Sequence, residues 1–132
     1  MAENNIIKIP ILGKESIVVG NNLTAYIAKD VVSSVKASTY CIITDENVAM
    51  YHLENLENLL TKEANALGRR VLSYVIPAGE LQKCRDTKNE IEDYLLTNKC
   101  TRDTCILALG GGVIGDLSGM ELINSNYNYY YY

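Results

Sequence analysis

The sequence has no long apolar run and no concentration of basic charge. No apolar stretch in its 132 residues approaches the roughly 20 residues that cross a bilayer, so we expect no membrane partner and no membrane-spanning segment. The formal net charge is -4, and the twelve Lys and Arg residues are scattered, with only Arg69 and Arg70 adjacent. Because a nucleic-acid surface needs a basic stripe that releases counterions, we also expect no nucleic-acid partner.

Histidine is scarce, and the cysteines are not paired in sequence. His52 is the only histidine, and the four cysteines Cys41, Cys84, Cys100 and Cys105 show no C-x-x-C spacing. We therefore expect no metal site in this chain, and we expect His52 to lie on the surface. Cys41 and Cys105 lie inside apolar, strand-like runs, as is typical of buried free thiols in a reducing compartment. The first residues lack the basic and apolar regions of a signal peptide, so we predict a cytoplasmic protein.

What the sequence does have is an alternation of strand-like and helix-like segments. We predict a hairpin over 6–11 and 16–20, strands over 39–44, 71–76 and 104–109, and helices over 22–35, 49–67 and around 91–95. Asn22 is expected to cap the first helix, and Gly68 to end the second. Near-continuous apolar strands separated by helices are typical of an α/β fold. The expected architecture is an incomplete Rossmann-like parallel sheet with helices on both faces and an N-terminal hairpin.

The most informative stretch runs from Thr104 to Gly119, where an apolar strand leads into Gly110-Gly-Gly and then Asp116. Glycine has no Cβ to hold a ligand away, and a helix N-terminus carries partial positive charge, so the stretch suits a phosphate. Ligands of such sheets bind at the carboxyl ends of the strands. The residues that follow the strands are Asp45-Glu46-Asn47, Pro77 to Lys83, and Gly110 to Val113 with Asp116. Their acids, lysine and glycines together predict a dinucleotide site.

Each of these features could also be purely structural. Gly110 to Gly115 satisfy G-x-G-x-x-G, but the usual fingerprint opens a domain at its first strand, with an acid about 20 residues later. A glycine turn without a ligand is therefore an alternative. Asp45 fits equally well as a helix N-cap, and Lys83 as a solvated lysine in the first turn of a helix. No Gly-Lys-Ser/Thr follows the glycines, which excludes a P-loop.

Three segments together resemble one known family. They are Pro77 to Glu80, Cys100 to Thr104, and Gly110 to Gly119. They resemble 3-dehydroquinate synthase, most of all the form that opens the fungal pentafunctional AROM polypeptide. Ile9 to Gly13 and Ser16 to Gly20 are similar to the start of that polypeptide, so the resemblance covers roughly residues 6–119. Related sugar-alcohol and iron-dependent alcohol dehydrogenases typically carry serine at the position of Val113, which favours the synthase.

The resemblance implies a set of NAD-binding residues and a reaction. The residues are Asp45, Glu46, Asn47, Glu80, Leu81, Gln82, Lys83, Gly111, Gly112, Val113 and Asp116. The implied reaction converts 3-deoxy-D-arabino-heptulosonate 7-phosphate to 3-dehydroquinate and phosphate, in the shikimate pathway of chorismate and aromatic amino acid biosynthesis. In the family, NAD oxidises a ring hydroxyl and later returns the hydride. A zinc ion held by one Glu and two His of a second domain polarises the substrate. The full-length family is also expected to form homodimers.

The sequence after Gly119 departs from the family. Five of the ten tyrosines fall in the last six residues, where the family continues towards its substrate-binding residues and zinc domain. We therefore expect a partial NAD-binding domain over 1–120 and an Asn/Tyr low-complexity tail over 121–132. We predict a truncated product or a mis-spliced gene, with an inactive NAD-binding fragment of the synthase that lacks the zinc ligands.

Two alternatives to a synthase fragment stay open. The chain could be a non-catalytic nucleotide-binding or self-associating protein that uses its tail, or a piece of a related glycerol or iron-dependent alcohol dehydrogenase. The departure after Gly119 also has a structural consequence. If the strand over 104–109 is the last of the sheet, its neighbours should expose apolar surface, and the isolated chain should be poorly soluble.

Overall fold

The computed structural model describes residues 6–77, 85–111, 114 and 128–131. The elements in chain order are β1 (Ile7–Ile11), β2 (Lys14–Val19), α1 (Thr24–Ser34), β3 (Thr39–Asp45), α2 (Glu46–Val48), the π-helix η1 (Ala49–Leu53), α3 (Glu54–Asn65), β4 (Arg70–Ile76), α4 (Arg85–Thr97), β5 (Thr104–Leu109) and β6 (Asn128–Tyr131). The predicted α/β fold, with its parallel sheet and N-terminal hairpin, is confirmed. The bounds of β3, β4 and β5 agree with the predicted strands to within one residue.

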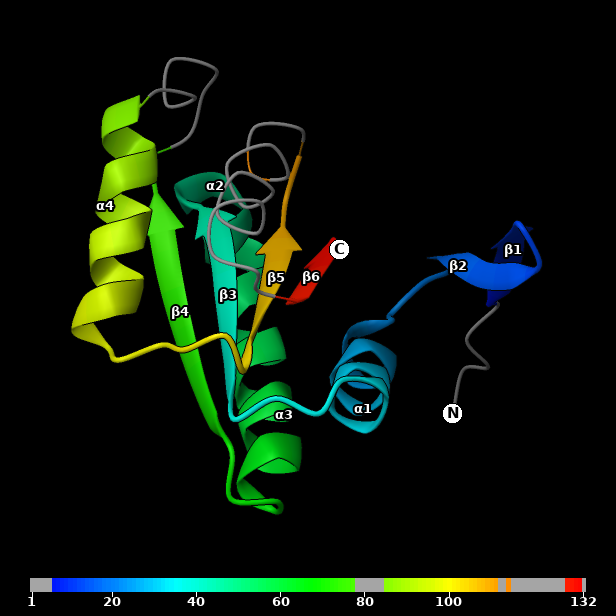
Figure 1. Ribbon diagram of the computed structural model, residues 1–132. Helices are drawn as coiled ribbons and strands as arrows, with labels where there is room; N and C mark the ends of the chain where they lie inside the picture. Colours follow the sequence, from blue (N-terminus) through cyan, green and yellow to red (C-terminus); the bar gives the residue numbers. More distant parts are fainter. Residues whose placement is uncertain (1–5, 78–84, 112–113, 115–127, 132) are drawn as a thin grey trace.

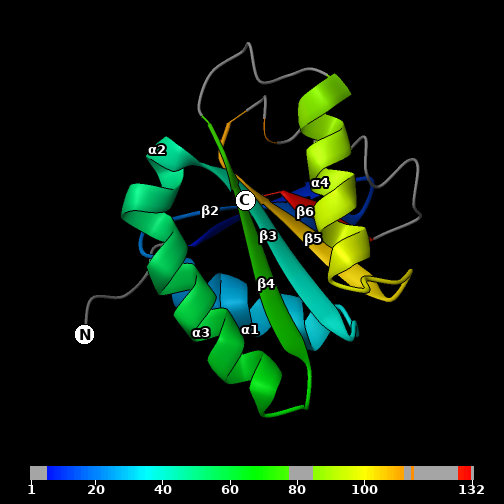
Figure 2. The same ribbon diagram turned by 90° about the vertical axis from the view of Figure 1, so that its left-hand side faces the viewer.

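The main sheet has the strand order β4-β3-β5-β6. β3 pairs in parallel with β4 and with β5, and β5 pairs in parallel with β6. The first parallel strand of the chain therefore lies between the second and the third. Figure 2 shows α1 and α3 on one side of the sheet and α4 on the other. This is a doubly wound arrangement with the strand order 2-1-3, as in flavodoxin-like folds.

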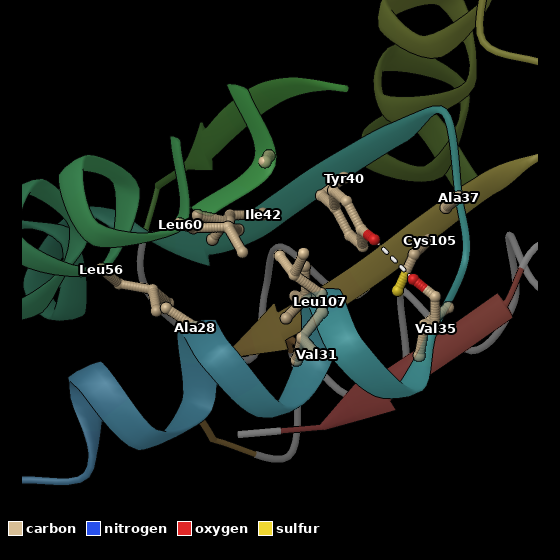
Figure 3. Packing of buried hydrophobic residues seen from close by; sticks show 12 residues of the cluster. Ala28, Val31, Val35, Ala37, Tyr40, Ile42, Leu56, Leu60, Cys105 and Leu107 are labelled. Atoms are coloured by element: carbon tan, nitrogen blue, oxygen red, sulfur yellow. Dashed lines mark hydrogen bonds between the residues drawn. The ribbon is translucent and has the colours of Figure 1, made fainter. Parts of the chain in front are cut away.

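Both faces of the sheet are buried, because helices cover each of them. Tyr40 and Ile42 of β3 belong to the apolar cluster beneath α1 and α3, which Figure 3 shows from close by. Cys41 and Ile43, which alternate with them along the strand, belong to the cluster beneath α4. A strand buried on both faces can be apolar at every position, which accounts for the continuous apolar runs in the sequence.

The two predicted helix boundaries have different outcomes. The expected cap at Asn22 is wrong, because α1 begins at Thr24 with Leu23 at the N-cap, and no side chain caps it. The second helix is confirmed but begins earlier than expected, since α2, η1 and α3 follow one another without a break from Glu46 to Asn65. Gly68 lies just beyond this helix with φ +71°, the left-handed conformation that ends helices and favours glycine.

The hairpin of β1 and β2 is built around a tight turn and stands away from the main sheet (Figure 1). Leu12 and Gly13 form the loop, with φ values of 52° and 79°, as a type I′ turn requires. Every residue of β1 is exposed. The strand over 104–109 is not the last of the sheet, because β5 pairs with β6, and Cys105 to Ala108 are fully buried. The low solubility expected of the isolated chain stays a prediction. Many of the exposed apolar side chains lie on the hairpin, and others lie on η1, β4 and α4.

Candidate functional site

The carboxyl ends of β3, β4 and β5 meet at one edge of the sheet, where their arrowheads lie in Figure 1. The pairing places Asp45 beside Ile76, and Thr44 beside Leu109. The chain leaves β3 towards α3 on one face and reaches β5 from α4 on the other. β3 and β5 therefore flank the topological switch point, the place where doubly wound folds bind their ligands.

Asp45 has two roles at this edge. Its Oδ1 accepts a hydrogen bond of 2.8 Å from the backbone N–H of Val48, so the side chain caps the helix that begins at Glu46. The alternative of Asp45 as an N-cap is thus confirmed for one oxygen. The other oxygen, Oδ2, faces Gly110 at the end of β5, where a Cβ built on that glycine would lie 3.8 Å away. The carboxylate therefore caps a helix with one oxygen and lies next to the glycine run with the other.

Gly110 occupies a position that strongly favours glycine. Its φ is +148°, and a Cβ there would lie 3.1 Å from Cγ1 of Ile114 and 3.4 Å from its Cβ. Ile114 is 1% exposed and packs in the cluster beneath α4, so it has little room to move. Gly111, in contrast, is exposed, and a Cβ built on it would meet nothing within 4 Å. The first glycine is required by packing, and the second leaves its backbone open to a ligand.

The structure shows where part of the predicted NAD-binding set lies, and the role of every member stays a prediction. Glu46 and Asn47 are exposed in the first turn of the helix that Asp45 caps, at the same edge as Gly111. The remaining predicted residues lie outside the described part of the chain, so their roles stay predictions. They are Glu80, Leu81, Gln82, Lys83, Gly112, Val113 and Asp116.

Two residues at this edge were missed by sequence reasoning. Ile114 sets the space around Gly110, and the only signal for it was an apolar residue within the glycine-rich stretch. Thr44 is fully buried, and its hydroxyl has no hydrogen-bond partner among the described residues. The position of a single polar residue at the end of an apolar strand could have identified it. An unpartnered buried hydroxyl beside the switch point is unusual, because buried polar atoms are normally bonded.

The described cysteines are buried, and the only histidine is exposed. Cys41, Cys100 and Cys105 are free and buried, as predicted, while Cys84 lies outside the described residues. Burial raises the pKa of Cys105 to about 12, and it also raises the pKa of Cys41. These two thiols therefore stay protonated near neutral pH and are poor nucleophiles. His52 is exposed on η1, as expected.

The adjacent arginines bind within the fold at the opposite end of the strands. Nη1 of Arg69 donates to the hydroxyl of Tyr40 at 2.7 Å and to the carbonyl of Val32 at 3.0 Å. Nε of Arg70 donates to Oγ1 of Thr39 at 2.8 Å. Both guanidinium groups thus tie elements together, and neither lies beside Asp45 or Gly110.

The described part of the chain contains neither a cluster of metal ligands nor a helix suited to a membrane. Within 6–77, 85–111, 114 and 128–131, no group of three or more His, Cys, Asp or Glu side chains could hold a metal ion. Over the same residues, no helix combines the length and the apolar character that crossing a membrane requires.

Known proteins of similar sequence cover the part of the chain that forms this edge of the sheet. A family model described as 3-dehydroquinate synthase N-terminal matches residues 73–128. The chain is also 52% identical over 120 residues to the pentafunctional AROM polypeptide of Schizosaccharomyces pombe, and 44% identical over 119 residues to that of Schizosaccharomyces japonicus. Each match covers 89% of this chain and 8% of the polypeptide, so the chain spans only a small part of these relatives.

Solved structures show the synthase fold. A crystal structure of 2-deoxy-scyllo-inosose synthase matches with a TM-score of 0.69 at 14% identity, over 98% of this chain and 35% of that one. A second structure of that enzyme, complexed with carbaglucose-6-phosphate, NAD+ and Co2+, matches with a TM-score of 0.69 at 15% identity, over 98% of this chain and 34% of the other. At such low identity the likeness shows a shared fold, and the fold includes both the parallel sheet and the hairpin.

Proposed function

We propose that this chain supplies the NAD-binding part of a 3-dehydroquinate synthase. The observation that carries the proposal is the approach of Oδ2 of Asp45 to Gly110 at the β3/β5 switch point. This places an acid that suits a ribose hydroxyl beside a glycine run that suits a pyrophosphate. The structure of 2-deoxy-scyllo-inosose synthase with NAD+ supports the choice of cofactor, because that enzyme shares the fold.

The residues present fit such a cofactor. The carboxylate of Asp45 is partly exposed and has one oxygen outside its capping bond, so it can accept a hydrogen bond from a hydroxyl. Gly111 is exposed, and nothing lies within 4 Å of the position its Cβ would take, so a ligand could approach this residue closely. We infer that Glu80 to Lys83 and Asp116 complete the set. When bound, NAD would supply the reversible transfer of a hydride.

The reaction of the complete enzyme is proposed from the family. It converts 3-deoxy-D-arabino-heptulosonate 7-phosphate to 3-dehydroquinate with release of phosphate. We propose that this chain alone binds NAD weakly and does not complete the reaction, because the resemblance places the zinc and substrate ligands beyond the position of Gly119. Zinc use, a homodimer and a cytoplasmic location follow from the same resemblance and composition, and they belong to this proposal.

Calorimetric titration of NAD into matched variants tests the proposal. Asp45→Asn keeps an N-cap residue of equal quality but removes the negative charge. We expect NAD affinity to fall about tenfold with no change in thermal unfolding. Asp93→Asn removes the charge of an exposed side chain on α4, and it should leave the NAD affinity unchanged. An unchanged NAD affinity in Asp45→Asn, or no NAD binding to the unaltered chain at millimolar concentration, would contradict the proposal.

A further inference from the structure

The side chain of Ile114 lies where any residue other than glycine at position 110 would carry its Cβ. A Cβ built on Gly110 would lie 3.1 Å from Cγ1 of Ile114, 3.4 Å from Cβ of Ile114 and 3.8 Å from Oδ2 of Asp45. An apolar side chain and a carboxylate oxygen therefore approach the same side of Gly110. This contact connects a core residue with the two neighbouring parts of the candidate site, the acid and the glycine run.

The core holds Ile114 in place. Ile114 is 1% exposed and belongs to the apolar cluster beneath α4. Ile76, Ile91 and Leu95 belong to the same cluster, and each of them is at most 1% exposed. Protein cores are close-packed, so a side chain in such a cluster cannot shift without moving its neighbours. The position of Ile114 is therefore set by the core and not by the glycine run.

The conformation of Gly110 depends on what packs against it. Without a Cβ, glycine takes positive and negative φ values about equally readily, so sterics within the residue do not select one conformation. The φ of Gly110 is +148°, and in this conformation Gly111 is exposed, with nothing within 4 Å of the position its Cβ would take. A fixed apolar side chain against Gly110 favours this conformation over the others that glycine allows.

We propose that Ile114 is a positioning residue of the cofactor site, and that it acts through Gly110. Its side chain holds the end of β5 in the conformation that presents Gly111 beside Asp45. This role rests on the proposed binding of NAD at this edge. The affinity of a ligand falls with the fraction of molecules whose site is in the binding-competent conformation. A glycine run that is competent in only about one molecule in ten would bind NAD about tenfold more weakly.

Backbone NMR relaxation of the NAD-free chain tests the restraint itself. Ile114→Ala removes the Cγ1 that lies nearest to Gly110. The order parameters of the Gly110 and Gly111 amides should then fall from about 0.85, typical of rigid backbone, towards the flexible range below about 0.6. The matched control is Ile91→Ala, because Ile91 is 0% exposed in the same cluster but lies on α4. This control should leave both glycine amides as rigid as in the unaltered chain.

Calorimetric titration of NAD into the same chains tests the consequence for binding. Ile114→Ala should weaken NAD binding about tenfold, whereas Ile91→Ala should change the affinity by less than about twofold. Ile114→Val retains Cβ and the Cγ carbons, so it should keep both the affinity and the order parameters of the unaltered chain. If Ile114→Ala does not fold, trimethylamine N-oxide is added equally to every chain, because this osmolyte strengthens apolar burial.

Three results would overturn the role of Ile114 and leave the proposed function standing. In the first, the glycine amides stay rigid in Ile114→Ala, so the side chain does not hold the glycine run. In the second, these amides become mobile but the NAD affinity does not change, so the restraint has no effect on binding. In the third, Ile91→Ala weakens NAD binding as much as Ile114→Ala does, so both substitutions act only through stability.

A fourth result contradicts the proposed function instead. If the unaltered chain binds no NAD at millimolar concentration, the edge is not a cofactor site. The positioning role of Ile114 then fails with it, whatever the order parameters of the glycine amides show.

Discussion

Gly110 shows how one residue connects the fold to the candidate site. Its positive φ and the nearby side chain of Ile114 both disfavour a Cβ, while Oδ2 of Asp45 faces the same position. Gly111 has neither constraint. In the glycine run, Gly110 is therefore constrained by the packing of the fold, whereas Gly111 has free space around it.

Replacing each glycine by alanine should have different effects on stability. Gly110→Ala should lower the free energy of unfolding by about 1–3 kcal/mol, because it combines a disfavoured φ with a contact against a buried side chain. Gly111→Ala should change the free energy of unfolding by less than about 0.5 kcal/mol. Urea unfolding followed by circular dichroism measures both values. Equal stability of the two variants would show that Gly110 is not confined as the structure indicates.

The buried thiols give the stability a pH dependence at high pH. Burial raises the pKa of Cys105 from 9.0 to about 12, and the pKa of Cys41 is raised in the same direction. The unfolded chain loses these protons at a lower pH than the folded chain does. The stabilisation is therefore complete below about pH 9 and is lost as the pH rises towards 12, by about 1.4 kcal/mol per pH unit for each thiol.

Urea unfolding between about pH 8 and about pH 10.5 checks this dependence. Cys105→Ala removes one titrating thiol, so its free energy of unfolding should fall less steeply with pH than that of the unaltered chain. The comparison rests on the slope alone, because the substitution also changes packing. Identical slopes would mean that the thiol of Cys105 is accessible to solvent in the folded state.

At the scale of elements, one hydroxyl joins a helix, a strand and the start of another strand. The hydroxyl of Tyr40 in β3 donates to the carbonyl of Val35 at the end of α1, as the dashed line in Figure 3 shows. It also accepts the 2.7 Å bond from Arg69, next to β4. Three segments far apart in the sequence are thereby held at the amino end of the sheet.

Tyr40→Phe should cost about 1–3 kcal/mol of unfolding free energy, because it leaves the carbonyl of Val35 and a guanidinium N–H without this partner. Tyr51→Phe is the matched control, since Tyr51 is 75% exposed and should tolerate the loss of its hydroxyl. Thermal unfolding of the two variants measures the difference. A Tyr40→Phe chain as stable as the Tyr51→Phe chain would show that water replaces these bonds.

At the scale of the whole molecule, the hairpin carries a cluster of exposed apolar side chains. Ile7, Ile9, Ile17 and Val19 of the hairpin are 61%, 42%, 43% and 50% exposed, and the pairing of Ile7 with Val19 and of Ile9 with Ile17 places all four on one face. Exposed apolar patches promote association. Association of the isolated chain is therefore expected to involve the hairpin rather than the sheet.

Replacing two of these side chains should raise solubility without weakening the sheet. In Ile7→Thr/Ile17→Thr, we expect a higher soluble concentration and an unfolding midpoint within error of the unaltered chain, since exposed substitutions cost little. Val75→Thr, at a 42% exposed position on β4, provides a control outside the hairpin and should have little effect on solubility. An equal gain from Val75→Thr would place the associating surface elsewhere.

The sequence predicted individual helices and strands more reliably than it predicted helix caps and strand pairing. The strand over 104–109 and the helix around Ile91 were found because their apolar periodicity is local. The Asn22 cap was wrong, because the chain begins α1 two residues later and leaves Asn22 with φ +51°. The low-complexity composition of 121–132 gave no indication of β6, because backbone pairing with β5 leaves no side-chain pattern. At the candidate site, Asp45 and the glycine run were found, and Thr44 and Ile114 were missed.

The amino-acid sequence by itself determined the α/β class, the strand positions, the N-terminal hairpin and the resemblance to 3-dehydroquinate synthase. These depend on periodicity and on motifs within short stretches of chain. Only the tertiary structure decided that Asp45 faces Gly110, that Ile114 confines that glycine, and that 128–131 pair with β5. Strand order and register join residues far apart in the chain, and no local pattern specifies which strands become neighbours.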